Sequence, residues 1–266
     1  MGAMTRTLAP NLDYDRRAAE YARHRKVHPG VVEELIAAGR LNAGTRVLDV
    51  GCGTGNYAAV LTERVGCRMF GVEPSAQMRE RARTAAPWES LVAGAAEALP
   101  FPDASFDLVF TTDVIHHVGD RGAYFREAER VLRPGGRLAT VTDSHEDIPQ
   151  RRPLSSHFPE TIPVELRRYP AVSRLLAEMA EAGFCDPCLA HVSHEYALTD
   201  LQSYWDKAFS SLHLIGEDAF AHGMARLESD LASGPIPCVS LYTVIWGTKP
   251  GTDQDVSSNE KGSAHP

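Results

Sequence analysis

Short apolar runs alternate with amphipathic segments through the first half of the chain. The first run, at residues 46–50, is apolar apart from Arg46 and Asp49, which is typical of a strand buried on both faces of a sheet. Residues 57–65 have the spacing of an amphipathic helix, and residues 68–72 return to an apolar strand pattern. A strand, a helix and a strand within about 30 residues predict the parallel crossover of a doubly wound α/β sheet.

The alternation continues as far as Thr142. The further elements that it predicts are a helix at 76–85, strands at 91–93 and 106–112, a helix at 123–132, and a strand at 137–142 entered through a turn at 133–136. Two helices are expected before the first strand, at 13–24 and 29–39. Pro29 lies in the first turn of the second helix, and Gly39 fits its C-terminal cap. Residues 41–142 therefore form the core of the predicted fold, and residues 1–40 precede it.

The regular alternation lapses from Asp143 onward. Four prolines between residues 149 and 163 interrupt any long element, and we interpret residues 143–169 as a flap across the top of the sheet. The most basic stretch of the chain lies here, through Arg151, Arg152, Arg167 and Arg168. Beyond it the pattern predicts a helix at 171–182, a strand at 184–196, helices at 200–210 and 216–231, a strand at 238–247, and a disordered tail over 251–266. We expect residues 143–250 to complete the same domain.

The composition fits a protein with a sizeable apolar core. The chain has 266 residues, of which 43% are hydrophobic, and a formal net charge of −8. This acidic balance argues against sequence-independent nucleic-acid binding, which requires a basic surface. The sequence contains neither a membrane-span pattern nor the apolar core of a signal peptide, so we expect a cytoplasmic protein. The five cysteines are expected to be reduced, and the pair Cys185 and Cys188 is interpreted as structural, with no metal site.

Three alternating glycines follow the first predicted strand. Gly51, Gly53 and Gly55 form a turn almost without side chains, which lets a ligand approach the backbone N–H groups where the next helix begins. The third glycine comes one residue too early for a dinucleotide-binding turn, and no lysine followed by serine or threonine ends the loop as in a P-loop. Glu73, at the end of the second strand, is placed to bind ribose hydroxyls. These features indicate a nucleoside ligand without a diphosphate.

Five stretches in the first half of the chain together resemble a known enzyme family. They are VLDVGCGTGNYA (47–58), GVEPSAQM (71–78), GAAEALPFPDASFDLV (94–109), IHHV (115–118) and EAERVLRPGGRL (127–138). In this order they resemble the class I S-adenosylmethionine-dependent methyltransferases, of the small-molecule type that includes quinone methyltransferases. The resemblance implies a Rossmann-like, mostly parallel sheet of seven strands, with an antiparallel edge strand and a helical cap at residues 199–237.

The resemblance also implies which residues contact S-adenosyl-L-methionine. Asp49 and the glycine turn would hold its methionine part, and Glu73 its ribose hydroxyls. The full set, which lies at strand ends and in the leading helices, is Tyr21, Arg25, Asp49, Gly51, Cys52, Gly53, Asn56, Glu73, Pro74, Ser75, Met78, Ala96, Glu97, Thr111, Thr112 and His116. The residues up to 40 would cover the cofactor. Ala95 departs from the family, because relatives often carry there an acid that contacts the adenine amino group.

Three side chains are candidates for a catalytic base. His116 follows the fourth predicted strand, and Asp143 and His145 follow the fifth, at the sheet edge where ligands bind in open α/β folds. His116 could equally form part of the wall of the cofactor pocket. Asp143 could equally be a turn residue, because aspartate is common in the turns that follow strands. The arginines of the flap either recognise an anionic acceptor or form a solvated surface. The aromatic and leucine side chains of the cap predict either an apolar pocket or the ordinary core face of helices.

Three functions are compatible with this pattern. The first is methyl transfer from S-adenosylmethionine to an oxygen, nitrogen or carbon nucleophile of a small organic molecule, as in specialised metabolism. The second is methylation of arsenite or another soft element, which would require converging thiolates. The third is a regulatory protein that binds the cofactor without turnover. The expected partner is a small-molecule acceptor, without nucleic acid or membrane, and a homodimer is left open.

Overall fold

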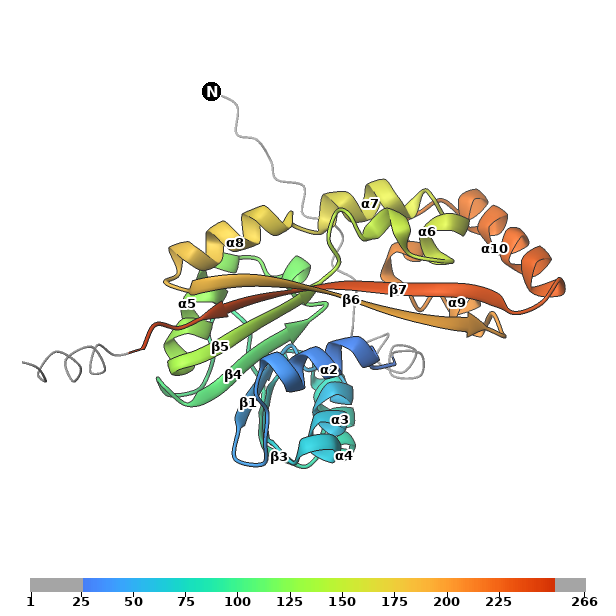
Figure 1. Cartoon of the computed structure of the whole chain (residues 1–266). Coiled ribbons are helices and arrows are strands. Elements are labelled where there is room, and N and C mark those ends of the chain that lie inside the picture. Colours follow the sequence, from blue (N-terminus) through green and yellow to red (C-terminus); the bar gives the residue numbers. More distant parts are fainter. Residues whose placement is uncertain (1–25, 252–266) are drawn as a thin grey trace, which may run out of the picture.

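The computed structural model describes residues 26–251, which contain a seven-stranded sheet with helices on both faces (Figure 1). The strands are β1 (Arg46–Val50), β2 (Arg68–Val72), β3 (Trp88–Val92), β4 (Phe106–Thr112), β5 (Leu132–Thr142), β6 (Cys185–Leu198) and β7 (Ile236–Thr248). The α-helices are α2 (Pro29–Ala38), α3 (Asn56–Val65), α4 (Ala76–Ala85), α5 (Arg121–Val131), α6 (Leu154–His157), α7 (Thr161–Arg168), α8 (Val172–Glu181), α9 (Gln202–Trp205) and α10 (Glu217–Ala232). Short 3-10 helices are η1 (Ile115–His117), η2 (Ile148–Gln150) and η3 (Ser210–His213). The predicted helix at 13–24 and the tail after residue 251 lie outside the described residues.

The strands are arranged in the order β3-β2-β1-β4-β5-β7-β6. The pairs from β3 to β5 are all parallel, and β7 is antiparallel to both of its neighbours. The expected α/β fold with a mostly parallel sheet is therefore confirmed. The antiparallel strand itself is β7, which lies one position inside the edge, and β6 forms the edge.

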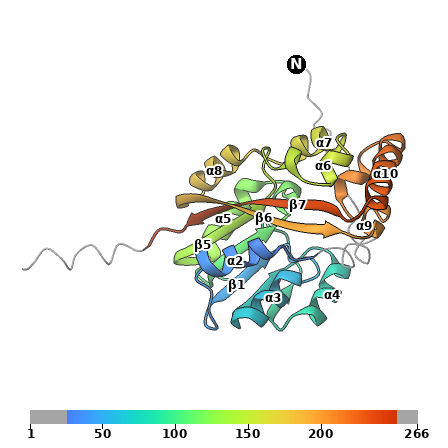
Figure 2. The same cartoon turned by 45° about the vertical axis from the view of Figure 1, so that its right-hand side comes forward.

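Two layers of helices cover the sheet (Figure 1, Figure 2). Helices α2 and α3 pack on one face around buried residues such as Leu35, Leu61 and Trp246. Helices α5 and α8 pack on the other face around Phe125 and Leu175. Strand residues alternate between these two clusters, as the period of two in a β-strand requires. Both faces are thus buried, which explains why the central strands are almost continuously apolar in sequence.

Two elements differ from the pattern-based expectation. Strand β3 begins at Trp88, three residues before the predicted strand, because the indole Nε1 donates to the carbonyl of Ala82 and its ring packs over Gly71. Strand β5 begins at Leu132 and includes the predicted turn. Backbone hydrogen bonds between residues 135–136 and Lys249 extend the pairing there, and the sequence gives no local signal of so distant a partner.

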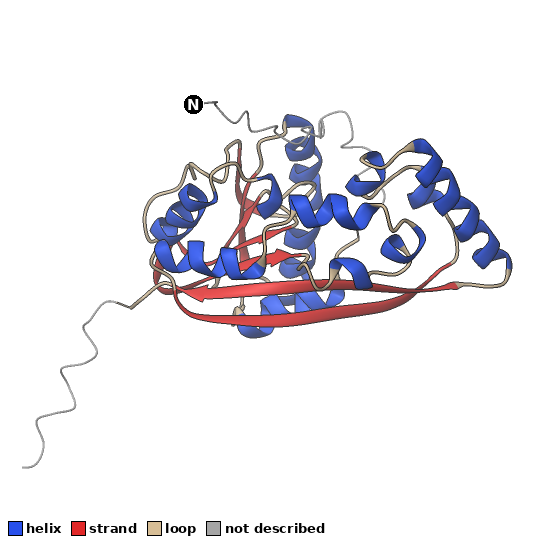
Figure 3. Ribbon diagram, turned by 90° about the horizontal axis from the view of Figure 1, so that it is seen from above, coloured by secondary structure: helices blue, strands red, loops and turns tan. Residues whose placement is uncertain are grey.

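Strands β6 and β7 form a hairpin that extends past the rest of the sheet (Figure 3). Strand β7 pairs with β6 along its length from Ile236 to Thr248, and it also pairs with β5 from Thr243 to Thr248. The flap closes on this projecting part, because Arg152 and Val239 exchange two backbone hydrogen bonds. Helices α9 and α10 lie between β6 and β7, where the cap was expected, and share a third apolar cluster with α6.

Candidate functional site

The glycine turn after β1 has the backbone conformation that its sequence predicts. Gly51, Gly53 and Gly55 have φ angles of 73°, 56° and 81°, in the left-handed region that side chains disfavour. A Cβ atom at Gly51 would lie 2.6 Å from Cγ2 of Val114, so the space is closed as well. The turn therefore brings bare backbone to the first turn of α3.

Two buried acids lie beside this turn. Asp49 is on β1, and Glu73 follows β2. Glu73 Oε2 accepts a hydrogen bond from the Gly53 N–H at 3.0 Å, and Oε1 accepts one from the Ser75 N–H at 2.9 Å. Burial, and then the charge of Glu73, raise the pKa of Asp49 well above its ordinary value. Such an acid pair favours a ligand that carries positive charge.

A cleft of about 500 Å³ opens between the turn and the end of β4. We call it the glycine-turn cleft; its lining residues are Lys26, Asp49, Gly51, Cys52, Gly53, Thr54, Asn56, Tyr57, Thr112, Asp113 and Tyr242. The structure thus brings together Asp49, Gly51, Cys52, Gly53, Asn56 and Thr112 from the set expected at the cofactor. Burial, together with Asp49 and Glu73, raises the pKa of the Cys52 thiol well above its ordinary value, so the thiol is neutral.

The other expected contacts within residues 26–251 are not among the residues that line this cleft. The Ser75 hydroxyl caps α4 by accepting from the Met78 N–H at 3.2 Å, and Met78 is buried. Glu97 Oε1 accepts from the Gly119 N–H at 2.9 Å. Pro74 is exposed, Ala96 packs against the core, and Thr111 is buried. Tyr21 and Arg25 lie outside the described residues.

A second cavity, of about 580 Å³, lies between the flap and the projecting part of β7. We call it the flap cavity; its lining residues are Asp113, Asp143, Arg151, Arg152, Leu154, Glu165, Tyr169, Tyr196, Tyr204, Phe209, Ser210, Val239, Ser240, Leu241 and Tyr242. Burial, with the charges of Asp113 and Asp143, raises the pKa of Tyr169 well above its ordinary value. The two cavities share two wall residues, Asp113 and Tyr242.

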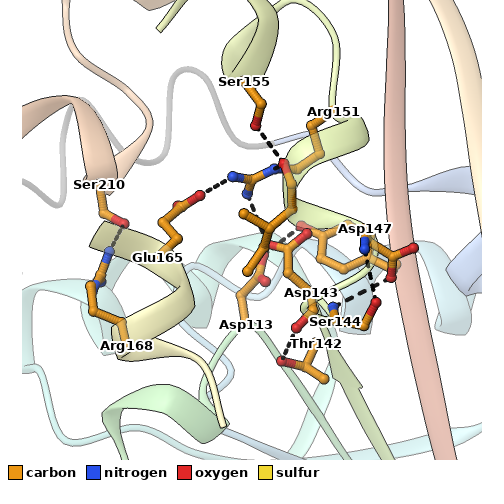
Figure 4. A network of polar contacts seen from close by, with 12 residues as sticks. Asp113, Thr142, Asp143, Ser144, Asp147, Arg151, Ser155, Glu165, Arg168 and Ser210 are labelled. Carbon is orange, nitrogen blue, oxygen red and sulfur yellow. Dashed lines mark hydrogen bonds and ion pairs between the residues drawn. The ribbon is translucent and has the colours of Figure 1, made fainter. Parts of the chain in front are cut away.

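A buried ion network forms one side of the flap cavity (Figure 4). Arg151 Nη1 donates to Asp143 Oδ2 at 3.1 Å, and Nη2 donates to Glu165 Oε2. The Arg151 Nε also donates to the Ile148 carbonyl at 3.3 Å. One cation thus balances two carboxylates, which does not favour the idea that Arg151 recognises an anionic acceptor. Arg168 donates to the Ser210 hydroxyl at 3.1 Å.

The three candidate bases have different surroundings. Asp143 lines the flap cavity within the ion network. His145 Nε2 lies 2.8 Å from the Tyr169 carbonyl oxygen. The His116 ring lies 4.1 Å from the Tyr169 ring and 3.9 Å from the His117 ring, measured between centroids. Neither histidine is among the residues that line the two cavities, as far as residues 26–251 show.

Sequence reasoning missed many of the residues that line the cavities. Five of them are Lys26, Tyr57, Asp113, Glu165 and Tyr242. Asp113 directly follows Thr111 and Thr112, so the rule that ligands bind at the carboxyl ends of strands would have included it. The other four gave no motif.

The cysteines do not converge on a site. Cys185 lies opposite Thr248 at one end of the hairpin, and Cys238 lies opposite Tyr196 towards the other end. Within the described part of the chain, no group of three His, Cys, Asp or Glu side chains has the arrangement of a metal site.

Comparison with known proteins decides the family. A model described as Methyltransferase domain matches residues 48–140. The demethylmenaquinone methyltransferase of Listeria monocytogenes is 31% identical over 194 residues, which cover 64% of this chain and 81% of that protein. The chain belongs to the class I S-adenosylmethionine-dependent methyltransferases.

Other relatives of this methyltransferase have a narrower overlap or a lower identity. The 27-O-demethylrifamycin SV methyltransferase of Amycolatopsis mediterranei is 43% identical over 105 residues, covering 37% of this chain and 39% of that protein. A solved methyltransferase of Anabaena variabilis, ascribed to an antibiotic biosynthesis pathway, has a TM-score of 0.64 at 24% identity and covers 82% of this chain and 96% of its own. The cyclase SpnF has a TM-score of 0.57 at 18% identity, and the match covers 90% of this chain and 94% of the SpnF chain. The last two likenesses concern the fold alone.

The family implies S-adenosylmethionine as methyl donor, and the chemistry of the residues at the glycine-turn cleft suits this donor. The donor is a sulfonium cation with an amino group, and the cleft holds the buried Asp49 beside Glu73. The glycine turn leaves room for its close approach to the backbone. No helix among residues 26–251 has both the length and the apolar character needed to cross a membrane.

Proposed function

We propose that this methyltransferase transfers a methyl group to an oxygen, nitrogen or carbon nucleophile of a small organic molecule in specialised metabolism. The observation that carries the proposal is the shared wall between the two cavities, because a donor in one and an acceptor in the other would meet at Asp113 and Tyr242. The lining of the flap cavity, which combines aromatic rings with a few polar groups, is typical of a small-molecule site. The names of two relatives also refer to small organic acceptors.

The residues of the glycine-turn cleft would hold the donor. Asp49 and the turn would bind its methionine part, and Glu73 would accept from the ribose hydroxyls. The adenine would lie between two groups of residues, Pro74, Ser75 and Met78 on one side and Ala96 and Glu97 on the other, with Thr111 and Thr112 below. Tyr21, Arg25 and His116 remain predicted contacts. When bound, the donor supplies an electrophilic methyl group.

The chain then has to align the acceptor, exclude water and remove a proton. Alignment alone can supply about 7–11 kcal/mol of the barrier when the reacting atoms are well placed. For a hydroxyl or carbon acid a base is also required, and Asp143, His145 and His116 are the candidates from sequence.

The soft-element alternative has little support from the thiols. Cys185 and Cys238 lie far apart along the hairpin, and burial raises the pKa of both, which disfavours the thiolate form. An assay for the product S-adenosylhomocysteine distinguishes an enzyme from a regulatory protein that binds the cofactor without turnover.

Binding of S-adenosylmethionine by calorimetry and release of S-adenosylhomocysteine with a panel of acceptors test the proposal. Glu73→Ala removes a carboxylate that accepts hydrogen bonds from the Gly53 and Ser75 N–H groups, and we expect binding to weaken about 10-fold or more. Glu89→Ala, which removes an exposed partner of Arg68, is the matched control and should bind as the wild type does. A folded protein that binds no S-adenosylmethionine would overturn the proposal, and binding without any product would favour the regulatory function.

A further inference from the structure

Asp113 and Tyr242 form a hydrogen-bonded pair in the wall between the two cavities. Tyr242 Oη donates to Asp113 Oδ2 at 2.5 Å. Asp113 directly follows β4, and Tyr242 is the first β7 residue beyond the pairing with β5. A donor–acceptor distance this short is typical of a strong hydrogen bond to a carboxylate. The pair thus lies where contents of the glycine-turn cleft and of the flap cavity would meet.

The surroundings hold both members of the pair in place. Asp113 has a φ angle of 57°, a left-handed conformation that is uncommon for a residue other than glycine and that clusters at functional sites. The Tyr242 ring meets the His28 ring edge to face, with centroids 5.3 Å apart. His28 Nε2 lies 3.3 Å from the Ser240 carbonyl oxygen, and its Nδ1 accepts from the Val31 N–H at the start of α2. The position of Tyr242 is therefore fixed by α2 as well as by β7.

The remaining walls of the flap cavity favour a neutral, planar acceptor. Aromatic rings surround it, from Tyr169, Tyr196, Tyr204 and Phe209, in addition to Tyr242. Rings of this kind pack against a planar ring through offset or edge contacts. Three carboxylates and two arginines line the cavity, and Arg151 is already paired with two of the carboxylates, so the lining has no excess of positive charge that would favour an anionic acceptor.

We infer that the Tyr242–Asp113 pair removes the proton from the hydroxyl group of a phenolic acceptor. The inference rests on the proposed function. The Tyr242 oxygen, whose own hydrogen is directed at Asp113, accepts the acceptor proton while the tyrosine proton moves to Asp113 Oδ2. The pair of electrons left on the acceptor oxygen forms the new O–CH₃ bond as the C–S bond pair of the donor returns to sulfur. The proton on Asp113 then leaves to solvent.

Two substitutions separate this role from a structural one. Asp113→Asn keeps a residue that tolerates positive φ and can still accept from Tyr242, but it removes the charge. Tyr242→Phe keeps the ring against His28 and removes the hydroxyl. Tyr124→Phe is the matched control, because it removes the hydroxyl of a buried tyrosine on α5 that lines neither cavity.

The first measurement does not depend on turnover. The full chain, saturated with S-adenosylhomocysteine, is titrated at neutral pH with 4-chlorophenol, which keeps its hydroxyl proton there, and with its methyl ether 4-chloroanisole, which has the ring but no hydroxyl proton. We expect the wild type to prefer the phenol by about 10-fold or more, because only the phenol can donate a hydrogen bond to the Tyr242–Asp113 pair. The preference should fall several-fold in Asp113→Asn, disappear in Tyr242→Phe and persist in Tyr124→Phe. Equal preferences in all four proteins, or no phenol binding by the wild type, would overturn the inference.

The second measurement separates kcat from KM with a phenolic acceptor. Asp113→Asn and Tyr242→Phe should each lower kcat by about 10²–10⁴-fold, more than they raise KM, because they disable the proton acceptor and leave the ring contacts of the cavity in place. A kcat in Asp113→Asn equal to that of the wild type would count against the pair. Absence of product from the wild type, with the phenol preference intact, would instead overturn the proposed function.

Discussion

Replacement of Arg151 by methionine tests the buried ion network in the flap. Asp143 on the sheet side and Glu165 on α7 are 5% and 3% exposed, and both bind the Arg151 guanidinium. Without the cation, two carboxylates face each other away from water. Breaking a buried pair in this way typically costs about 3–5 kcal/mol. For a chain of this size, that loss would lower Tm by roughly 6–20 °C.

Thermal and urea unfolding, followed by circular dichroism, measure this cost. The loss should be smaller at about pH 5 than at about pH 8, because protons neutralise carboxylates that have lost their cation. Arg168→Met is the matched control: it removes one hydrogen bond to the neutral Ser210 hydroxyl, which is worth about 0.5–1.5 kcal/mol.

A rescue variant distinguishes the buried charge from lost packing. Arg151→Met combined with Asp143→Asn and Glu165→Gln leaves no buried charge, and it should recover most of the lost free energy of unfolding. The reasoning would be refuted if Arg151→Met cost no more than Arg168→Met, or if the triple variant were less stable than Arg151→Met alone.

Three further predictions concern the glycine-turn cleft and the helix before it. Gly51→Ala should abolish binding of S-adenosylmethionine in calorimetry, because its φ is 73° and the new Cβ would lie 2.6 Å from Val114. The free energy of unfolding, measured in urea, should fall as the pH drops below about 6.5: burial lowers the pKa of His28 in the folded protein, so the unfolded chain takes up the proton first. Affinity for S-adenosylmethionine should rise with pH, since the raised pKa of Asp49 leaves part of the free protein protonated and a bound cation favours the carboxylate.

Each of these has its own control. Gly216→Ala, where a Cβ meets nothing within 4 Å, should bind the cofactor normally, and equal losses in both glycine variants would contradict the prediction. His28→Asn keeps a capping side chain and should flatten the pH dependence of stability; an unchanged slope would assign it to another group. Asp49→Asn should make affinity independent of pH, and a persisting dependence would exclude Asp49 as its source.

The donor side of the site could be predicted from sequence because its signals are local. The glycine turn lies within a few residues of Asp49, and Glu73 ends the next strand, so motif and strand order sufficed. The contacts of individual side chains with the donor remain predictions. Strand β5 shows the limit of this logic, because its first residues look like a turn and become strand only through pairing with Lys249.

The acceptor side depends on contacts between distant parts of the chain. Asp113 and Tyr242 are 129 residues apart in sequence, and nothing in either segment indicates that they meet. The arginines of the flap looked alike in sequence, yet Arg151 is buried between two acids and Arg167 is exposed. Charge pattern alone cannot separate a buried ion pair from a solvated surface.

The β6–β7 hairpin joins the seven-stranded sheet to the helical insertion of residues 199–235. Its inner half is bonded to β5 and shares the framework that carries the glycine turn, whereas its outer half carries α9 and α10. Residues 199–235 could therefore be recombined between relatives without disturbing the hydrogen bonds of the inner half. Such a graft would have to bring matching residues from α6, since Leu154 and Phe158 pack in the same apolar cluster. Because Tyr204, Phe209 and Ser210 line the flap cavity, such an exchange would replace part of the cavity wall and leave the glycine turn as it is.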